Sequence, residues 1–139
     1  MVQNPKQSRV VMAVSAGAAM YVLAAFLRSA IYRHLSLADW FAPIDAIVVY
    51  VIAMLAGIVA MLLCGRRNLL ASALAAGVGE IAHSLLKHYE IAIASSRPVS
   101  LSGFISPVFL GAIPAALLGA AGAALWLCTV HNSSGPAAE

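Results

Sequence analysis

The chain has 139 residues, of which 63% are hydrophobic and only 9% are charged. Soluble domains average about 45–50% apolar and about 25% charged residues, so this composition excludes an ordinary soluble fold and indicates a membrane protein. The formal net charge of +3 is small and dispersed along the chain. Because no glycine-rich phosphate-binding motif or basic run accompanies that charge, the sequence predicts no nucleic-acid partner.

Four apolar segments predict four transmembrane helices. A helix needs about 20 residues to cross a hydrocarbon core of about 30 Å, and each segment reaches that length: 10–31, 44–63, 69–94 and 104–130. The first segment is longer than the roughly 7–15 residues of a signal-peptide core, which favours a retained helix over a cleaved signal. We therefore predict one all-α domain, a four-transmembrane-helix bundle, with a polar tail over residues 131–139.

Small residues recur at helical spacing in three of these segments and predict close helix contacts. They are Ser15, Ala18 and Ala19 in the first segment, Ala53 and Gly57 in the second, and Gly111, Ala115, Gly119 and Ala123 in the fourth. Cys64 and Cys128 fall near one end of the bundle. We expect both to be buried thiols that pack as small apolar residues.

The third apolar segment carries ionisable side chains at membrane depth. At about 100° per residue, Glu80, His83, Ser84 and Lys87 share one broad face of the predicted helix. A charge inside the bilayer is costly, by roughly 2.5 kcal/mol or more, so we expect this face to turn inward and to find partners. One expectation for Glu80 is an interhelical hydrogen bond with Tyr50 or a backbone carbonyl.

The basic residues divide evenly between the two ends of the bundle. Four lie at the end that holds the termini, namely Lys6, Arg9, Arg66 and Arg67, and four at the other, namely Arg28, Arg33, Lys87 and Arg97. The number of cations therefore does not decide the orientation. Because Arg66 and Arg67 fill a minimal turn between the second and third helices, we expect both termini to be cytoplasmic, in a bacterial-type inner membrane.

The end opposite the termini gathers basic and imidazole side chains that predict an anion site. The candidate residues are Arg28, Arg33, His34, Lys87, His88 and Arg97. Such cations bind phosphate or carboxylate groups, and lipid headgroups are the local supply. The alternative is that these cations reach the interface and pair with Asp39, Asp45 and Glu90. The leading hypothesis is a non-catalytic binding or assembly protein whose partners are membrane lipids, other membrane subunits or a second copy.

Residues 41–111 resemble the early part of the type 2 phosphatidic acid phosphatase superfamily, membrane enzymes that hydrolyse lipid and polyprenyl phosphates. The matching features are Asp45 before an apolar helix, the basic turn Arg66-Arg67, the run Leu85-Leu86-Lys87, then Arg97-Pro98, and Ser102-Gly103 opening the next helix. In that family the Lys and Arg of a K-x6-R-P motif bind phosphate. The resemblance implies that role for Lys87 and Arg97.

The same comparison shows where this chain departs from the family. Lys87 and Arg97 are separated by nine residues, and Phe104 stands where the family's P-S-G-H motif has the His that protonates the leaving group. No Arg follows Arg97, so the later S-R-x5-H-x3-D motif, which supplies the nucleophilic His, is absent. The family also has six helices. A phosphatase-like enzyme is therefore an alternative to the binding protein, and the sequence assigns no catalytic residue.

Two further chemistries use the third segment. His83 and His88 are five residues apart, about 140° around a helix, so they cannot easily share a metal ion. Haem ligation by His83 would need a facing His, and His34 and His131 lie outside the apolar spans. We predict no metal and no cofactor, with haem at His83 as an alternative. Glu80 could also exchange protons in a small proton-coupled transporter.

Overall fold

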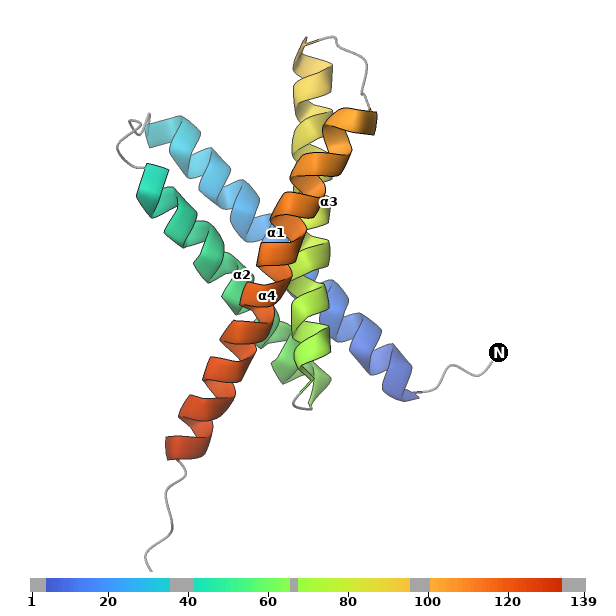
Figure 1. The fold of residues 1–139 in the computed structure, drawn as a ribbon, viewed down its shortest axis with the longest axis vertical. Helices are drawn as coiled ribbons and strands as arrows, with labels where there is room; N and C mark the ends of the chain where they lie inside the picture. The colour runs from blue at the N-terminus through green and yellow to red at the C-terminus, as the bar shows by residue number, and fades with distance from the viewer. Residues whose placement is uncertain (1–4, 36–41, 66–67, 96–100, 134–139) are drawn as a thin grey trace, which may run out of the picture.

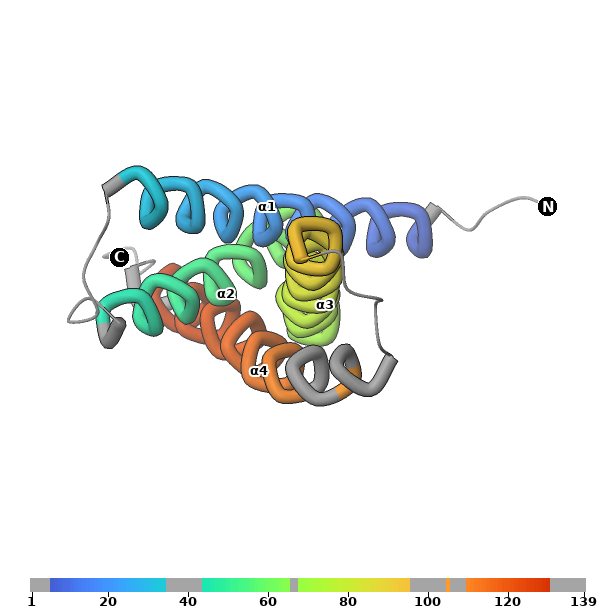
Figure 2. The backbone as a smooth tube through the Cα atoms, turned by 90° about the horizontal axis from the view of Figure 1, so that it is seen from above, coloured from blue at the N-terminus to red at the C-terminus, as the bar shows by residue number. Residues whose placement is uncertain are grey.

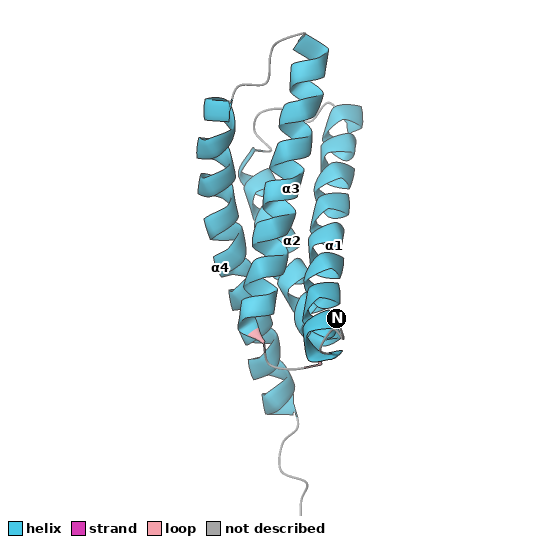
Figure 3. Cartoon of the chain, turned by 90° about the vertical axis from the view of Figure 1, so that its right-hand side faces the viewer, coloured by secondary structure: helices cyan, strands magenta, loops and turns pink. Residues whose placement is uncertain are grey.

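The protein is a bundle of four long helices (Figure 1). A computed structural model describes residues 5–35, 42–65, 68–95 and 101–133. The helices are α1 (Pro5–Leu35), α2 (Ala42–Cys64), α3 (Leu69–Ser95) and α4 (Leu101–Ser133). They confirm the predicted all-α architecture; the helices overlap lengthwise in the view of Figure 3 but cross one another in Figure 1.

Three of the helices are clearly longer than the apolar segments that predicted them. α1 begins five residues earlier than expected, and α4 begins at Leu101 and continues through Ser133. The first three residues of the predicted polar tail, 131–133, thus continue α4. Hydrophobicity marks only the part of a helix at hydrocarbon depth, whereas the helix itself ends where its backbone hydrogen bonding stops.

A short connection separates α2 from α3, and the two helices pack against each other. Gly65 ends α2 with a φ of 65°, a left-handed conformation that glycine adopts without steric cost. Asn68 then caps α3, because its side-chain oxygen accepts a hydrogen bond of 3.1 Å from the backbone N–H of Ala71. Both neighbours, α1 and α4, pack on this central pair from opposite sides (Figure 2).

Neighbouring helices approach one another most closely where their side chains are smallest. Gly57 of α2 packs against the backbone of Gly119 in α4, and a Cβ on Gly119 would lie 2.7 Å from the Cβ of Ala76 in α3. On the other side, a Cβ on Gly17 of α1 would lie 2.8 Å from the carbonyl oxygen of Ala56. The helices therefore cross at one level and diverge towards their ends, as Figure 1 shows.

The burial pattern confirms most of the predicted small-residue contacts and corrects two of them. In α2 and α4, the contact residues Ala53, Ala115 and Ala123 are buried. In α1, however, Ser15 and Ala19 are exposed, and Gly17 makes the close contact instead. Small size permits a close approach, but the crossing angle decides which small residues face the neighbour.

The two cysteines also differ from the prediction that both are buried. Cys64 is buried, whereas Cys128 is exposed, and both are free thiols. Cys128 lies near the C-terminal end of α4, and this end of the helix diverges from the other helices in Figure 1. Its surroundings therefore do not include the packed core that encloses Cys64.

The outer surface of the bundle is apolar, as expected of a protein in lipid. Large exposed side chains include Leu23, Leu55, Ile113 and Leu117, and soluble monomers rarely expose a continuous surface of this kind. Each helix contains a stretch long and apolar enough to cross a membrane: Lys6–His34, Ile44–Cys64, Leu69–Ser95 and Leu110–Val130. The chain is an integral membrane protein with four spans.

Candidate functional site

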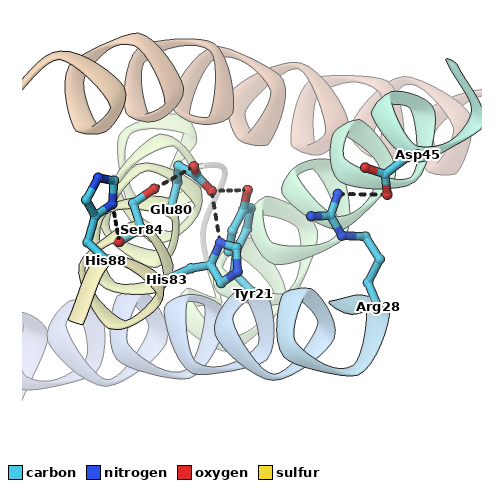
Figure 4. A network of polar contacts seen from close by, with 7 residues as sticks. All are labelled: Tyr21, Arg28, Asp45, Glu80, His83, Ser84 and His88. Atoms are coloured by element: carbon cyan, nitrogen blue, oxygen red, sulfur yellow. Dashed lines mark hydrogen bonds and ion pairs between the residues drawn. The ribbon is translucent and has the colours of Figure 1, made fainter. Parts of the chain in front are cut away.

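A polar network surrounds Glu80 in the middle of the bundle. Tyr21 of α1 donates a hydrogen bond of 2.7 Å to Glu80 Oε2, and Ser84 donates one of 3.0 Å to Oε1. His83 Nδ1 lies 3.7 Å from Oε2. Figure 4 shows these three side chains directed at one carboxylate. The network thus supplies polar partners for a group that is only 17% exposed, as a carboxylate in a membrane requires.

Glycines on two helices provide the space that this network occupies. A Cβ on Gly79 would lie 2.6 Å from the Cβ of Tyr21, and a Cβ on Gly111 of α4 would lie 2.7 Å from Glu80 Oε1. The His83 ring packs edge-on against Phe26, with 5.7 Å between the ring centres. The predicted inward orientation of Glu80 and His83 is therefore seen in the structure, with contacts on several helices.

The partner of Glu80 is a residue that the sequence reasoning missed. We expected Tyr50 or a backbone carbonyl, but Tyr50 is 50% exposed and Tyr21 makes the hydrogen bond. Tyr21 is almost completely buried. A signal was available, because Tyr21 is a hydroxyl-bearing residue near the middle of an otherwise apolar helix, where a buried hydroxyl needs a partner.

Two of the predicted cations form ion pairs between helices. Arg28 Nη1 lies 3.0 Å from Asp45 Oδ1 and joins α1 to α2, and Arg33 Nη1 lies 3.2 Å from Glu90 Oε1 and joins α1 to α3. The expected pairing of cations with acids is therefore confirmed for these two residues. Arg28 is the more enclosed, with its side chain 15% exposed. Its Nε is buried and has no hydrogen-bond partner among the described residues.

These groups border three neighbouring cavities. The mouth cavity, of about 450 Å³, lies between α1, α2 and α3, and its polar lining includes Arg28, Ser29, Tyr32, Arg33, Asp45, His83, Lys87 and Glu90. The inner cavity, of about 300 Å³, is lined by Tyr21, Arg28, Glu80, His83, Ser84, Lys87 and His88 together with apolar side chains. The lateral cavity, of about 200 Å³, is bordered by Tyr21, Tyr50 and Glu80 and by apolar residues of α2 and α4.

The structure brings together most, but not all, of the predicted anion-site residues. Lys87 borders both the mouth and the inner cavities. His88 borders the inner cavity, where its Nδ1 lies 3.2 Å from the carbonyl oxygen of Ser84. His34 is exposed near the end of α1. Arg97 and Asp39 lie outside the described residues.

The charged groups around the cavities support binding chemistry. In the described ranges, no three His, Cys, Asp or Glu side chains gather so as to hold a metal ion. His83 faces Glu80 and Phe26, and haem ligation by His83 stays a prediction. The cavities instead place cationic, carboxylate and imidazole groups around spaces large enough for a small ligand group.

Comparison of the chain with protein-family models, with curated proteins and with solved structures finds no match. The resemblance to the phosphatase superfamily therefore stays a prediction.

Proposed function

We propose that this integral membrane protein binds an anionic lipid headgroup in the mouth cavity, with Lys87 as the main binding residue. The supporting observation is an imbalance of charge at this cavity. Arg28 and Arg33 pair with Asp45 and Glu90, whereas Lys87 forms no ion pair within the described parts of the chain. One cation in the mouth cavity is therefore available for an incoming anion.

The chemistry of the lining suits a phosphate group. Lys87 offers an ammonium group, and Arg28, whose buried Nε has no hydrogen-bond partner among the described residues, lines the same cavity. Charge-assisted hydrogen bonds of this kind contribute about 1.5–3 kcal/mol each. A lipid phosphodiester and free inorganic phosphate share the recognised group. The membrane location favours the lipid, because headgroups are concentrated at the interface.

The position of the mouth cavity supports access from one membrane surface. Its lining comes from the C-terminal halves of α1 and α3 and from the start of α2, where α1 and α2 diverge from α3 (Figure 1). The opposite end holds the α2–α3 turn, and a Cβ on Gly65 there would lie 3.9 Å from Arg9. We place this basic end in the cytoplasm of a bacterial-type cell, which directs the mouth cavity to the outer leaflet.

The test is the affinity of the purified protein, in an uncharged detergent, for a short-chain phosphatidylglycerol. Lys87→Gln should weaken binding about tenfold or more, the equivalent of one charge-assisted hydrogen bond. Arg9→Gln, at the opposite end, is the matched control and should leave the affinity unchanged. Equal affinity in the wild type and in Lys87→Gln would refute the proposal.

Inorganic phosphate in the same assay separates the two sources of the ligand. If the lipid is the ligand, phosphatidylglycerol should bind much more tightly than phosphate, because its glycerol and acyl groups add contacts that the free ion lacks. Phosphate that binds as tightly, and with the same dependence on Lys87, would identify a soluble anion instead. The phosphatase-like alternative predicts, in addition, release of phosphate from a lipid phosphomonoester.

A further inference from the structure

Glu80 and His83 lie between the cavities rather than within only one of them. His83 borders both the mouth cavity and the inner cavity, and Glu80 borders both the inner cavity and the lateral cavity. His83 Nδ1 and Glu80 Oε2 are 3.7 Å apart. The pair therefore combines a partly buried acid with a buried base, and each member faces a space that a small ligand or water could enter.

With Glu80 itself included, the charges around the mouth and inner cavities balance before any ligand binds. α1 contributes Arg28 and Arg33, α2 contributes Asp45, and α3 contributes Lys87 and Glu90 together with Glu80 itself. With neutral imidazoles, three cations meet three carboxylates. The uncharged titratable groups around the cavities are Tyr21, Tyr32, Tyr50, His83 and His88. The described α4 residues that border the lateral cavity, Leu110, Gly111, Pro114, Ala115 and Leu118, carry no charge.

An anion that enters the mouth cavity disturbs this balance. It adds one negative charge close to Lys87 and His83, in surroundings where charge is poorly screened. Mobile ions are scarce at membrane depth, so a proton on a nearby base is the simplest compensating charge. Of the bases around the mouth cavity, only His83 also contacts a buried carboxylate among the described residues.

We infer that the Glu80–His83 pair takes up one proton from water when the anion binds, so that ligand and proton bind together. This inference rests on the proposed binding function. The added proton belongs to the pair, as imidazolium beside carboxylate or as imidazole beside carboxylic acid. Because linkage is reciprocal, a proton on the pair must also tighten anion binding. The ligand site thereby acquires a dependence on pH that Lys87 alone would not confer near neutrality.

Isothermal titration calorimetry measures this proton directly. Short-chain phosphatidylglycerol suits the experiment, because its phosphodiester keeps one negative charge and exchanges no proton near neutral pH. Titrations in buffers of different ionisation enthalpy give the number of protons taken up per lipid. We expect up to one proton in the wild type and none in the double variant Glu80→Gln/His83→Gln. His34→Gln, which removes an exposed imidazole at the end of α1, should retain the uptake.

The outcomes separate this inference from the proposed function. If the wild type does not bind the lipid, the proposed function fails and the inference fails with it. If lipid binds without proton uptake, or with the same uptake in the double variant, only the inference is overturned.

A second measurement covers the case in which the double variant does not fold. The affinity of the wild type should then fall with rising pH, by up to tenfold per pH unit, as uptake of one proton requires. An affinity that stays constant between about pH 5 and pH 9, a range that includes the ordinary pKa of histidine, would overturn the inference.

Discussion

Glu80 can occupy the membrane interior because its carboxylate accepts two hydrogen bonds and lies beside an imidazole. The hydroxyl of Tyr21 is the only one of these partners that comes from another helix among the described residues. It therefore connects α1 to α3 at membrane depth, where an unpartnered polar group costs the most free energy. Removing one partner of such a contact leaves the other unsatisfied, whereas removing both leaves apolar surfaces in contact.

Tyr21→Phe should lower the free energy of unfolding by about 1–3 kcal/mol, because Glu80 loses a buried donor. Thermal unfolding in detergent measures the loss, with Tyr50→Phe as the control at an exposed tyrosine. Glu80→Leu combined with Tyr21→Phe should recover part of the loss, since both polar partners are then gone. If the double variant is as destabilised as the two single changes added together, the contact contributes nothing to the fold.

Glu80→Lys should disrupt the same region for an electrostatic reason. The new ammonium would lie on the face of α3 that carries Lys87, close to Arg28 in the inner cavity, and an unpaired charge in the bundle is strongly destabilising. We expect aggregation or loss of the folded fraction in size-exclusion chromatography. Glu80→Leu should elute as the wild type does. A well-folded Glu80→Lys protein would show that water reaches this position freely.

The helices pack through backbone contact more than through large side chains. Tyr21 is the largest side chain that is almost completely buried in the described residues, and most of the other buried hydrophobic residues are alanines. Glycines at the crossing of α2, α3 and α4 allow the backbones to approach closely. In lipid, where apolar burial gives little driving force between helices, this close van der Waals contact is the main source of association.

Gly119→Leu should destabilise the bundle by roughly 1–3 kcal/mol or more through overpacking. A side chain there would meet Ser72 and Ala76 of α3, and the backbone of Ser72 cannot move aside. Ala121→Leu, two residues further along the same helix on an exposed surface, is the matched control. An unchanged thermal midpoint for Gly119→Leu would contradict the observed crossing.

The two ends of the whole molecule differ in how their cations are used. At the mouth cavity, Arg28 and Arg33 form ion pairs between helices. At the other end, Arg9 is exposed and lies close to the α2–α3 turn. Basic side chains that take part in no ion pair or ligand site are the ones expected to keep a segment on the cytoplasmic side of the membrane. The orientation we propose follows from this difference, because the numbers of cations at the two ends are equal.

Cysteine labelling in intact cells tests that orientation. In a variant without Cys64 and Cys128, cysteines introduced at Ser36 and Ser100 should react with an impermeant reagent added outside, and one at Ser134 should react only after the membrane is opened. The proposed topology predicts this pattern because two of the positions follow the mouth ends of α1 and α3. Labelling of the Ser134 variant in intact cells, with no labelling of the other two, would reverse the model.

The sequence by itself determined the four helices and their membrane class, because span length and apolar composition are local properties of each segment. It also placed Glu80, His83 and Lys87 on one face of α3, since that relation depends only on helical geometry. The division of the cations between two ends follows from the order of the helices. These predictions required no knowledge of how one helix is rotated against another.

Only the tertiary structure decided which residues meet. Tyr21 rather than Tyr50 reaches Glu80, Gly17 rather than Ser15 or Ala19 faces the neighbouring helices, and Cys128 is exposed. Each of these outcomes depends on the rotation and crossing of whole helices, which arise from contacts between residues far apart in the chain. In a core made mainly of alanine and glycine, the sequence offers many helix faces of small residues, and each of them could form a helix contact. The backbone contacts around Gly57 and Gly119 select among them.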